Sequence, residues 1–264
     1  MKISAYIIAY NEADKIKDCI NSVLWADEII LADSHSDDGT SEIAEDLGVK
    51  VIHIPFKGYG NLRNQAITHC SNEWILSIDS DERCTEEVKD EILSLILDAP
   101  LDIYHIPRKN FFMGRWINHS GWFPNYRQPQ LFRSGKMIYT NEPVHEGYIN
   151  QSNNEIGFLK NFIWQFPFKN TEEIIYKANR YSTLGVKKLE RNGINGSVFK
   201  AFCHGLWSFI KHYFLKLGFL DGGAGLVIAF GNFEGTFYRY IKLTEKQSKW
   251  IPPKTNPIVR DKSE

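Results

Sequence analysis

Apolar and polar residues alternate along the first hundred residues in a pattern that predicts strands and helices in turn. Short apolar runs rich in β-branched residues are typical of buried strands, and apolar residues recurring every three or four positions are typical of helices. The predicted strands are 3–9, 28–32, 49–54, 74–78 and 102–106, and the predicted helices are 13–24, 41–47, 59–69 and 86–97. Because alternating strands and helices form a mostly parallel sheet covered on both faces, we expect an α/β fold.

This alternation stops near residue 107. Residues 108–150 are rich in Gly, Pro, Trp, Asn and Arg, with short strand-like pieces (QLFR, KMIYT), and predict an irregular or antiparallel insertion. Helical periodicity then returns over three segments: 171–192, about 197–217 and about 223–245. The pattern divides the chain into an α/β region (1–170), a helical region (171–250) and a loose tail (251–264).

Polar residues gather where the predicted strands end. Asn11, Asp33 and Asp79 each lie at or just past a strand end. In open parallel sheets, ligands bind beyond the carboxyl ends of the strands. We therefore expect these side chains to share one edge of the sheet and to form the binding site there.

The strongest local signal at this edge is the D-x-D motif in WILSIDSDE, residues 74–82. Asp79 and Asp81 are alternate residues of an extended segment, so their carboxylates project to the same side. Such carboxylates repel each other unless a divalent cation lies between them and a phosphate, and Mg²⁺ and Mn²⁺ favour these oxygen ligands. The alternative is a solvated acidic turn, but the position after a buried strand favours a metal site.

Three further residues each admit two interpretations. Asp33 at a strand end can accept a hydrogen bond from a nucleobase, whereas the Ser, Asp and Gly residues after it are typical of a tight turn. Tyr10 can stack on a base or be a core tyrosine. Arg63, on a predicted helix, can reach a diphosphate or be an ordinary surface arginine.

Composition excludes several classes of protein. The 264 residues carry 31 Lys and Arg against 32 Asp and Glu, so no overall basic charge indicates a nucleic-acid partner. Four scattered cysteines without zinc-ligand spacing predict reduced thiols. The absence of P-loop and G-x-G-x-x-G motifs argues against P-loop enzymes and classical dinucleotide dehydrogenases. No apolar run approaches the ~18 residues of a membrane span, so we expect a cytoplasmic protein.

Residues 200–242 combine basic and aromatic side chains. Five positive residues (Lys200, Lys211, Lys216, Arg239 and Lys242) stand against Asp221 and Glu234, with seven aromatic residues among them. A basic, aromatic helical surface suits an anionic bilayer interface. The alternative is that the aromatic residues are core and the lysines form a solvated face.

Several motifs together carry a resemblance to a known family. IIAYNEADKI, ILADSHSDDGT, GYGNLRNQA and WILSIDSDE, in this order and spacing, resemble the nucleotide-sugar half of a family 2 glycosyltransferase with the Rossmann-like GT-A fold. PRKNFFMGRWINHSGWFPN, VHEGY and YFLKLGFLDGGAGLVIA resemble the lipopolysaccharide core β-glucosyltransferase subgroup. The resemblance covers roughly residues 1–245 and implies that residues 1–170 are the catalytic region.

The resemblance also implies roles for individual residues. Tyr10 would stack on the uracil of a UDP-sugar and Asp33 would hydrogen-bond it, with Arg63 near the nucleotide. Asp79 would contact the ribose or the metal, and Asp81 would bind the Mg²⁺ or Mn²⁺ that bridges the diphosphate. Ala9 and Glu12 are placed in the same nucleotide-sugar site.

Glu146, in VHE, is the catalytic base that the resemblance implies, with Glu142 and Glu82 as rivals. His145 would orient Glu146 or approach the metal, or be structural. Trp122, Arg127 and His145 are the candidates for binding or supporting the acceptor. The subgroup usually has an arginine where this chain has Gln130. If that arginine holds the acceptor or a phosphate, either Arg127 or Arg133 replaces it or the acceptor differs.

The implied reaction is inverting transfer of a hexose, glucose first, from a UDP-sugar to a lipid-linked core oligosaccharide. It would take place on the inner face of the cytoplasmic membrane, with the enzyme bound peripherally and no nucleic acid involved. Several alternatives stay open: transfer to polyprenyl phosphate or another envelope glycan, a phosphohydrolase that uses the D-x-D motif, and an inactive sugar-nucleotide-binding protein.

Overall fold

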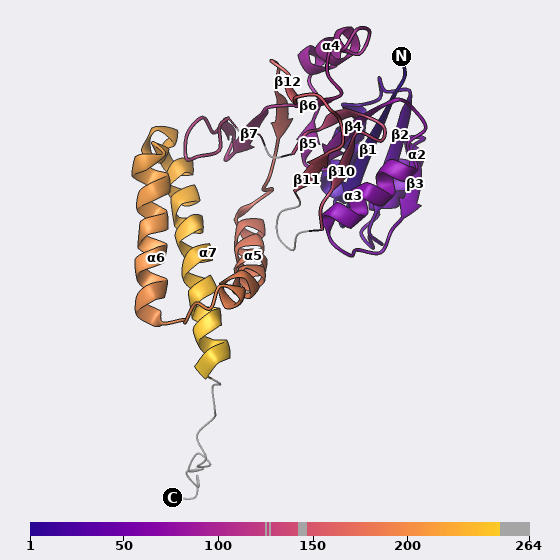
Figure 1. The fold of residues 1–264 in the computed structure, drawn as a ribbon. Helices are drawn as coiled ribbons and strands as arrows, with labels where there is room; N and C mark the ends of the chain where they lie inside the picture. Colours follow the sequence, from indigo (N-terminus) through magenta and orange to yellow (C-terminus); the bar gives the residue numbers. More distant parts are fainter. Residues whose placement is uncertain (125, 127, 142–146, 249–264) are drawn as a thin grey trace, which may run out of the picture.

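The computed structural model describes residues 1–124, 126, 128–141 and 147–248, and its largest element is a mixed sheet (Figure 1). The strand order is β12-β6-β9-β4-β1-β2-β3. Its strands are β1 (Ile3–Ala9), β2 (Glu28–Asp33), β3 (Lys50–His53), β4 (Trp74–Asp79), β6 (Ile103–His105), β9 (Leu131–Arg133) and β12 (Gly157–Phe158). Strands β4, β1, β2 and β3 are mutually parallel, as the sequence predicted.

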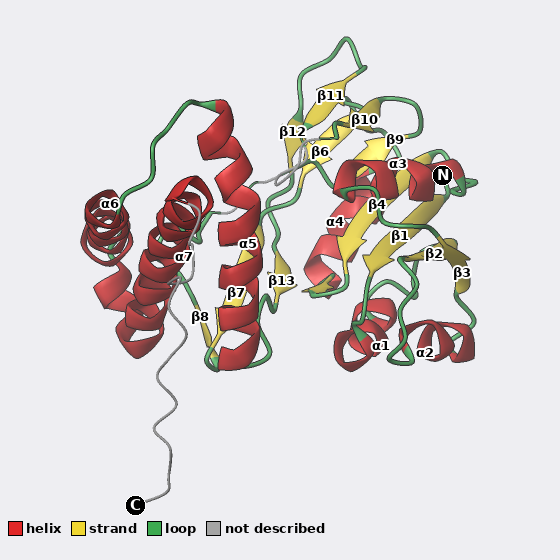
Figure 2. Ribbon diagram, turned by 90° about the horizontal axis from the view of Figure 1, so that it is seen from below, coloured by secondary structure: helices red, strands yellow, loops and turns green. Residues whose placement is uncertain are grey.

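Helices cover both faces of this sheet (Figure 2). Helices α1 (Ala13–Asn21), α2 (Thr40–Asp46) and α4 (Glu86–Leu95) pack on one face, through side chains such as Ile20, Ala44 and Ile92. Helix α3 (Tyr59–Thr68) packs Leu62 and Ala66 on the other. All seven residues of β1 are buried, because this central strand has helices above and below it. The predicted elements of this region are confirmed, with ends that differ by up to three residues.

Strand β9 was expected in an insertion, but it is part of the main sheet. It pairs antiparallel with both β4 and β6, so that β6 is not adjacent to β4. Leu131 packs into the core on one face and Phe132 into the core on the other. The sequence showed a short apolar strand here, but its partners are set by packing on both faces.

A second sheet lies beside the first, with strand order β5-β13-β7-β8. Its strands are β5 (Glu82–Arg83), β7 (Arg108–Phe112), β8 (Arg115–Trp116) and β13 (Ile163–Gln165), and a separate pair joins β10 (Met137–Tyr139) to β11 (Tyr148–Asn150). β13 pairs antiparallel with β5, with Gln165 opposite Glu82. This pairing brings a strand from the second half of the chain against the end of the D-x-D motif.

The helical region consists of α5 (Thr171–Arg191), α6 (Val198–Ile210) and α7 (Gly222–Ser248), with α7 between the other two (Figure 1). Asn170 and Ser197 cap α5 and α6 by accepting hydrogen bonds from the Glu173 and Lys200 amides. The predicted helix 197–217 is interrupted, because a π-helix, η1 (Lys211–Leu215), and a 3₁₀-helix, η2 (Gly218–Asp221), follow α6.

One buried carboxylate attaches these helices to the second sheet. Asp221 is buried and accepts hydrogen bonds from the backbone of Asn118 and His119 and from Ser120 Oγ at 2.7 Å. These three residues follow β8. Asp221, one of the two acidic residues counted in the segment 200–242, is therefore buried and has a structural role.

Candidate active site

The carboxyl ends of the parallel strands bring the predicted polar residues to one edge. In register, Ala9 of β1 lies opposite Asp33 of β2, and Ile8 lies opposite Asp79 of β4. The Ala9 carbonyl accepts a hydrogen bond from the Ser34 amide at 2.9 Å. The expected meeting of these segments at one edge is confirmed.

Asp79 is held by a buried arginine. Arg63 of α3 donates from Nη2 to Asp79 Oδ1 at 2.6 Å and from Nη1 to Ser77 Oγ at 3.0 Å, and its side chain is 3% exposed. The guanidinium also lies over the Tyr139 ring. The interpretation of Arg63 as a surface residue is therefore wrong. The buried guanidinium orients the Asp79 carboxylate and balances its charge.

Asp81 is held more loosely. Its carboxylate accepts from Gln165 Nε2 at 3.2 and 3.4 Å, and none of the described cations lies within ion-pair distance of it. The Asp81 backbone carbonyl accepts from the Phe166 amide, which fixes the turn against the end of β13. Asp81 thus keeps oxygen lone pairs available for a ligand and has no cationic partner among the described residues, whereas Asp79 forms an ion pair with Arg63 through Oδ1.

Glu82 is a structural carboxylate. It is fully buried, and it accepts from Arg108 Nε of β7, from the Asp79 amide at 3.0 Å and from Gln130 Nε2 at 2.8 Å. Burial raises the pKa of Glu82; Arg108 opposes this shift, and the nearby Asp79 and Asp81 charges add to it. A carboxylate without exposed surface has no access to an acceptor hydroxyl, so Glu82 is not a candidate base.

Gln130 and Arg133 do not bind ligand at this edge. Gln130 is buried and bridges the Ser77 carbonyl and the Glu82 carboxylate. Arg133 lies opposite Trp74, at the amino end of β4, where it pairs with Glu73 and Asp102. The expectation that Arg133 could replace the missing arginine in the site is therefore wrong, because it lies at the opposite end of β4 from the D-x-D motif.

The loop after β2 is ordered around Asp33. Asp33 is fully buried, and its carboxylate accepts from the amide and hydroxyl of Ser36 and pairs with His53 Nδ1 at 3.3 Å. The His53 ring stacks on His35, which has a left-handed backbone. Asp33 therefore shapes this pocket edge, and the two imidazoles are neighbours that the sequence did not single out.

Tyr10 and Glu12 frame the same edge from the segment after β1. Tyr10 is 58% exposed, so the interpretation as a core tyrosine is wrong and its ring is available for stacking. Glu12 pairs with Lys15 at 3.4 Å. Burial raises the pKa of Glu12 and the Asp81 charge adds to this shift, while Lys15 opposes it. Glu12 and Asp81 therefore lie close enough to repel each other.

A divalent cation would be held at this edge by few protein ligands. Among the described residues, no group of three acidic, histidine or cysteine side chains is arranged to hold a metal ion. Asp81, with its available oxygens, and Asp79 fit a Mg²⁺ or Mn²⁺ that takes its remaining ligands from phosphate and water. Arg127, Glu142, His145 and Glu146 lie outside the described residues.

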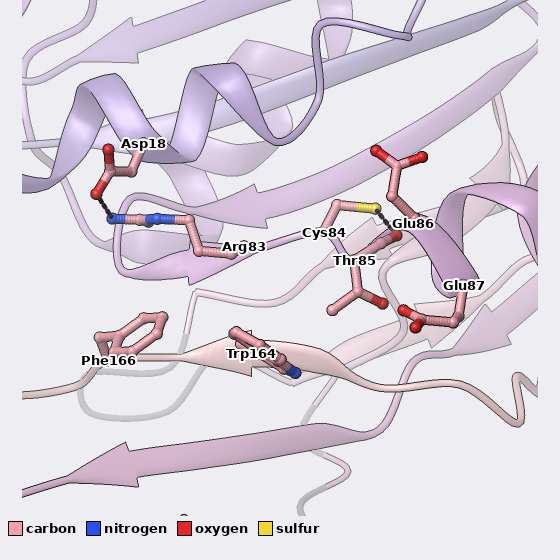
Figure 3. A pocket seen from close by; sticks show the side chains of 8 residues that line it. All are labelled: Asp18, Arg83, Cys84, Thr85, Glu86, Glu87, Trp164 and Phe166. Carbon is pink, nitrogen blue, oxygen red and sulfur yellow. Dashed lines mark hydrogen bonds and ion pairs between the residues drawn. The ribbon is translucent and has the colours of Figure 1, made fainter. Parts of the chain in front are cut away.

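Strand β13 separates two cavities, because successive side chains point to opposite faces of a strand. Trp164 and Phe166 face a groove of about 570 Å³ that Asp18 and Arg83 also line (Figure 3). Gln165 faces a second cavity of about 410 Å³, which Trp122 also lines. Gln165 of the smaller cavity donates to the Asp81 carboxylate, whereas Arg83 of the groove donates to the Ser80 carbonyl. The smaller cavity is therefore the one whose lining contacts a carboxylate of the D-x-D motif.

Sequence reasoning missed Arg108 and Gln165. Arg108 stood in a stretch expected to be irregular, and nothing nearby in sequence marks it as the partner of Glu82. Gln165 lies in a three-residue strand. The only available signal was the carboxylate of Glu82 itself. If this residue were buried, its charge would need a cation nearby in the core.

Replacing Glu82 tests this support directly. We expect Glu82→Ala to lower the free energy of unfolding by about 3–5 kcal/mol, because it leaves the Arg108 guanidinium buried and unpaired. Urea unfolding measures the change. The control Glu86→Ala removes an exposed carboxylate from the first turn of α4 and should cost under about 1 kcal/mol. Adding Arg108→Met to Glu82→Ala should restore part of the lost free energy of unfolding. Equal losses in Glu82→Ala and Glu86→Ala would contradict the assignment of Glu82 as a structural carboxylate.

Comparisons with known proteins agree with this geometry. The sequence model of the family described as "Glycosyl transferase family 2" matches residues 4–156. An uncharacterized glycosyltransferase of Rickettsia bellii is 33% identical over 98% of this chain and 94% of its own length. The lipopolysaccharide core biosynthesis glycosyltransferase LpsC of Rhizobium meliloti is 30% identical over 87% of this chain and 90% of its own.

A solved structure supports the fold. Residues 1–349 of TarS from S. aureus superpose with a TM-score of 0.50 and 18% identity, covering 94% of this chain and 92% of that one. At this identity the likeness concerns the fold alone. The family match covers more than half of the chain and includes β1, β2 and the D-x-D turn, which form the site edge. The chain therefore belongs to glycosyltransferase family 2, has the GT-A type of fold, and is a transferase enzyme.

Proposed function

We propose that the enzyme transfers a hexose, with glucose the preferred candidate, from a UDP-sugar to a lipid-linked core oligosaccharide with inversion. The observation that carries the proposal is the contrast within the D-x-D turn. Asp79 is neutralised by Arg63, while Asp81 keeps its carboxylate oxygens available at the sheet edge. The similarity to LpsC, named for lipopolysaccharide core biosynthesis, supports the choice of acceptor.

The donor would lie across the carboxyl ends of β1, β2 and β4. The exposed ring of Tyr10 suits stacking on uracil, and the Asp33 loop forms the adjacent wall. The Arg63 side chain is 3% exposed and donates to Asp79, so we assign it to positioning that carboxylate rather than to binding the nucleotide. Ala9 contributes through its backbone, where its carbonyl fixes Ser34 of the same loop.

Departure of UDP develops negative charge on the diphosphate. Asp81 and Asp79 would hold a Mg²⁺ or Mn²⁺ here, and such an ion would supply positive charge at that point. The acceptor oxygen forms its bond to the anomeric carbon while the bond from that carbon to the diphosphate oxygen breaks, and its electron pair leaves with UDP. The acceptor proton passes to a carboxylate base, for which Glu146 is our candidate.

A lipid-linked acceptor requires the enzyme to reach a bilayer. No single helix in the described part of the chain is long and apolar enough to span one, although a pair bent by 71°, Val198–Leu215 with Gly218–Ser248, reaches that composition together. Outside the helical core, one surface of α6 and η1 is apolar; we call it the α6 surface. It consists of Val198, Phe199, Phe202, Leu206, Trp207, Phe214 and Leu215, all at least 41% exposed.

The α6 surface has the character of a membrane-binding face. Exposed Lys200 and Lys211 lie in the same elements, Lys216 directly follows η1, and all three can contact anionic headgroups. In Figure 1, α6 is the helix farthest from the main sheet, so binding through it leaves the sheet edge accessible. We therefore infer that the enzyme binds peripherally to the cytoplasmic membrane through this surface.

Metal-dependent donor binding tests the role of Asp81. We expect Asp81→Asn to weaken UDP binding in the presence of Mn²⁺ by at least about tenfold, because it removes the carboxylate charge that holds the cation. Calorimetry with and without Mn²⁺ measures the effect. Asp90→Asn, an exposed change on α4, is the matched control. Wild-type affinity in Asp81→Asn would remove Asp81 from the metal site.

The base is tested by Glu146→Gln. We expect this variant to bind UDP-glucose normally and to transfer about 10²–10⁴ times more slowly, because the amide does not accept the acceptor proton. Turnover with a lipid-linked core oligosaccharide gives the rate. Glu142→Gln, four positions away, is the control and should retain activity. Unimpaired turnover of Glu146→Gln with loss in Glu142→Gln would move the base to Glu142.

Membrane binding is tested on the α6 surface. We expect Phe199→Glu with Leu206→Glu to reduce sedimentation with vesicles containing phosphatidylglycerol by at least about tenfold, since two apolar anchors are lost and two negative charges are added. Leu93→Glu with Leu97→Glu is the matched control: Leu93 lies in α4 and Leu97 just after it, and both are exposed and apolar.

Added salt should weaken the wild-type interaction, because the lysine contribution is screened. If wild-type protein self-associates through the α6 surface and does not sediment with vesicles, the membrane assignment is overturned.

A further inference from the structure

The cavity behind the D-x-D turn has features of a second binding site. Its volume is about 410 Å³, and it lies between strands β7 and β13 on one side and helices α5 and α7 on the other; we call it the inter-layer cavity. That volume is within the range of small-molecule sites. Nothing in the donor assignment uses it.

Gln165 connects this cavity to the catalytic edge. The side chain is 5% exposed and lines the cavity, while its Nε2 contacts both oxygens of Asp81. Its Oε1 is buried without a hydrogen-bond partner among the described residues. A buried amide oxygen that lacks a partner is costly, so this atom is suited to a donor group of a bound ligand. The cavity therefore begins one side chain away from Asp81.

Glycines on α7 keep the cavity open. A Cβ at Gly235 would meet no atom within 4 Å, and one at Gly231 would meet only the Ile174 methyl group at 3.7 Å. Both line the cavity, one helical turn apart. By contrast, Gly225 of the same helix is required by packing, because its Cβ would lie 1.8 Å from the Gly218 carbonyl oxygen. Gly231 and Gly235 weaken the helix without any such steric need.

A cation without an acidic partner faces the same space. Arg239 of α7 lines the cavity, forms no ion pair with any described residue, and has a buried Nε without a hydrogen-bond partner there. Gly185 of α5 makes room for it, since a Cβ there would lie 2.5 Å from Nε. Lys177 also lines the cavity, but Glu173 pairs with it at 2.9 Å. Arg239 is therefore the cation available to an anionic ligand.

Aromatic rings complete the lining. Trp122 and Phe168 pack against each other, and Tyr181 adds a third ring. Flat apolar walls with a few polar groups match the C–H face and hydroxyl edge of a sugar ring. Together with Arg239, this combination selects a sugar that carries a negative charge.

We propose that the inter-layer cavity binds the acceptor as an anionic saccharide, whose carboxylate or phosphate pairs with Arg239 while Trp122 and Phe168 hold its ring. The proposal rests on the proposed function and names the chemical class of its acceptor. Gln165 would hydrogen-bond the bound sugar and, through its contact with Asp81, align it with the donor edge. This proposal is consistent with the acceptor role expected for Trp122 from the sequence and assigns that role to the wall of the inter-layer cavity.

Calorimetry with simple sugars tests the proposal in the presence of UDP and Mn²⁺. The probes are D-glucuronate and D-glucose 6-phosphate, which separate carboxylate from phosphate recognition, and neutral D-glucose. We expect wild-type protein to bind at least one anionic probe about tenfold more tightly than glucose, as one charge-assisted hydrogen bond provides. Arg239→Gln should abolish this preference, and Arg239→Lys should restore part of it.

A filled cavity provides the second arm. Gly235→Leu should reduce binding of all three probes at least about tenfold, because its side chain enters the open space while improving helix propensity. Gly223→Leu is the matched control: it also lies in α7 with no atom within 4 Å of its Cβ, but outside the cavity. Thermal unfolding checks that each variant is folded.

The outcomes separate the two proposals. Wild-type protein that binds UDP with Mn²⁺ but shows no anionic preference, or no binding of any probe, overturns the acceptor assignment alone. An Arg239→Gln variant that keeps the preference does the same. Wild-type protein that binds no UDP overturns the proposed function itself.

Discussion

The geometry of the D-x-D turn depends on a single buried ion pair. Glu82 and Arg108 are both almost without exposed surface, and Glu82 also accepts from the Asp79 amide and from Gln130. A charge buried without a partner costs several kcal/mol, so the strands that supply these groups are held together as a unit. The same contacts set the direction in which Asp79 and Asp81 leave β4.

This arrangement explains why the carboxylates of Asp79 and Asp81 differ in their hydrogen-bond and ion-pair partners. Arg63 takes one oxygen of Asp79, whereas Asp81 receives only the longer contacts of a neutral amide. Electrostatic balance beneath the site is thus provided by Arg63 and Arg108, both buried, and a cation at the surface would meet a carboxylate that is not already paired. The third carboxylate of the cluster, Glu82, supports the other two from within the core.

Strand β13 gives the second half of the chain access to the site. It is three residues long, but it pairs with both β5 and β7, and its alternation sends Trp164 to one cavity and Gln165 to another. Asp221 fixes the helical region to the loop after β8. On the proposed function, these two attachments set how an acceptor held by the helices would meet a donor held by the main sheet.

The sequence by itself determined the local structure and the edge of the sheet at which the candidate site lies. Apolar periodicity placed the strands and helices of the first half to within three residues, since buried strands and amphipathic helices have distinct periods. It also brought Asn11, Asp33 and Asp79 to one edge, because parallel strands end on the same side. The motifs pointed to the family, which the family match confirms.

Only the tertiary structure decided which groups became partners across long separations. Arg108 and Gln130 reach Glu82 from 26 and 48 residues away, and Gln165 reaches Asp81 from 84 residues away. Local periodicity carries no information about such pairings, because they are fixed by side-chain packing between sheets. For the same reason, the sequence left Arg63 and Glu82 ambiguous, while the fold buries both and makes them the support of the D-x-D turn.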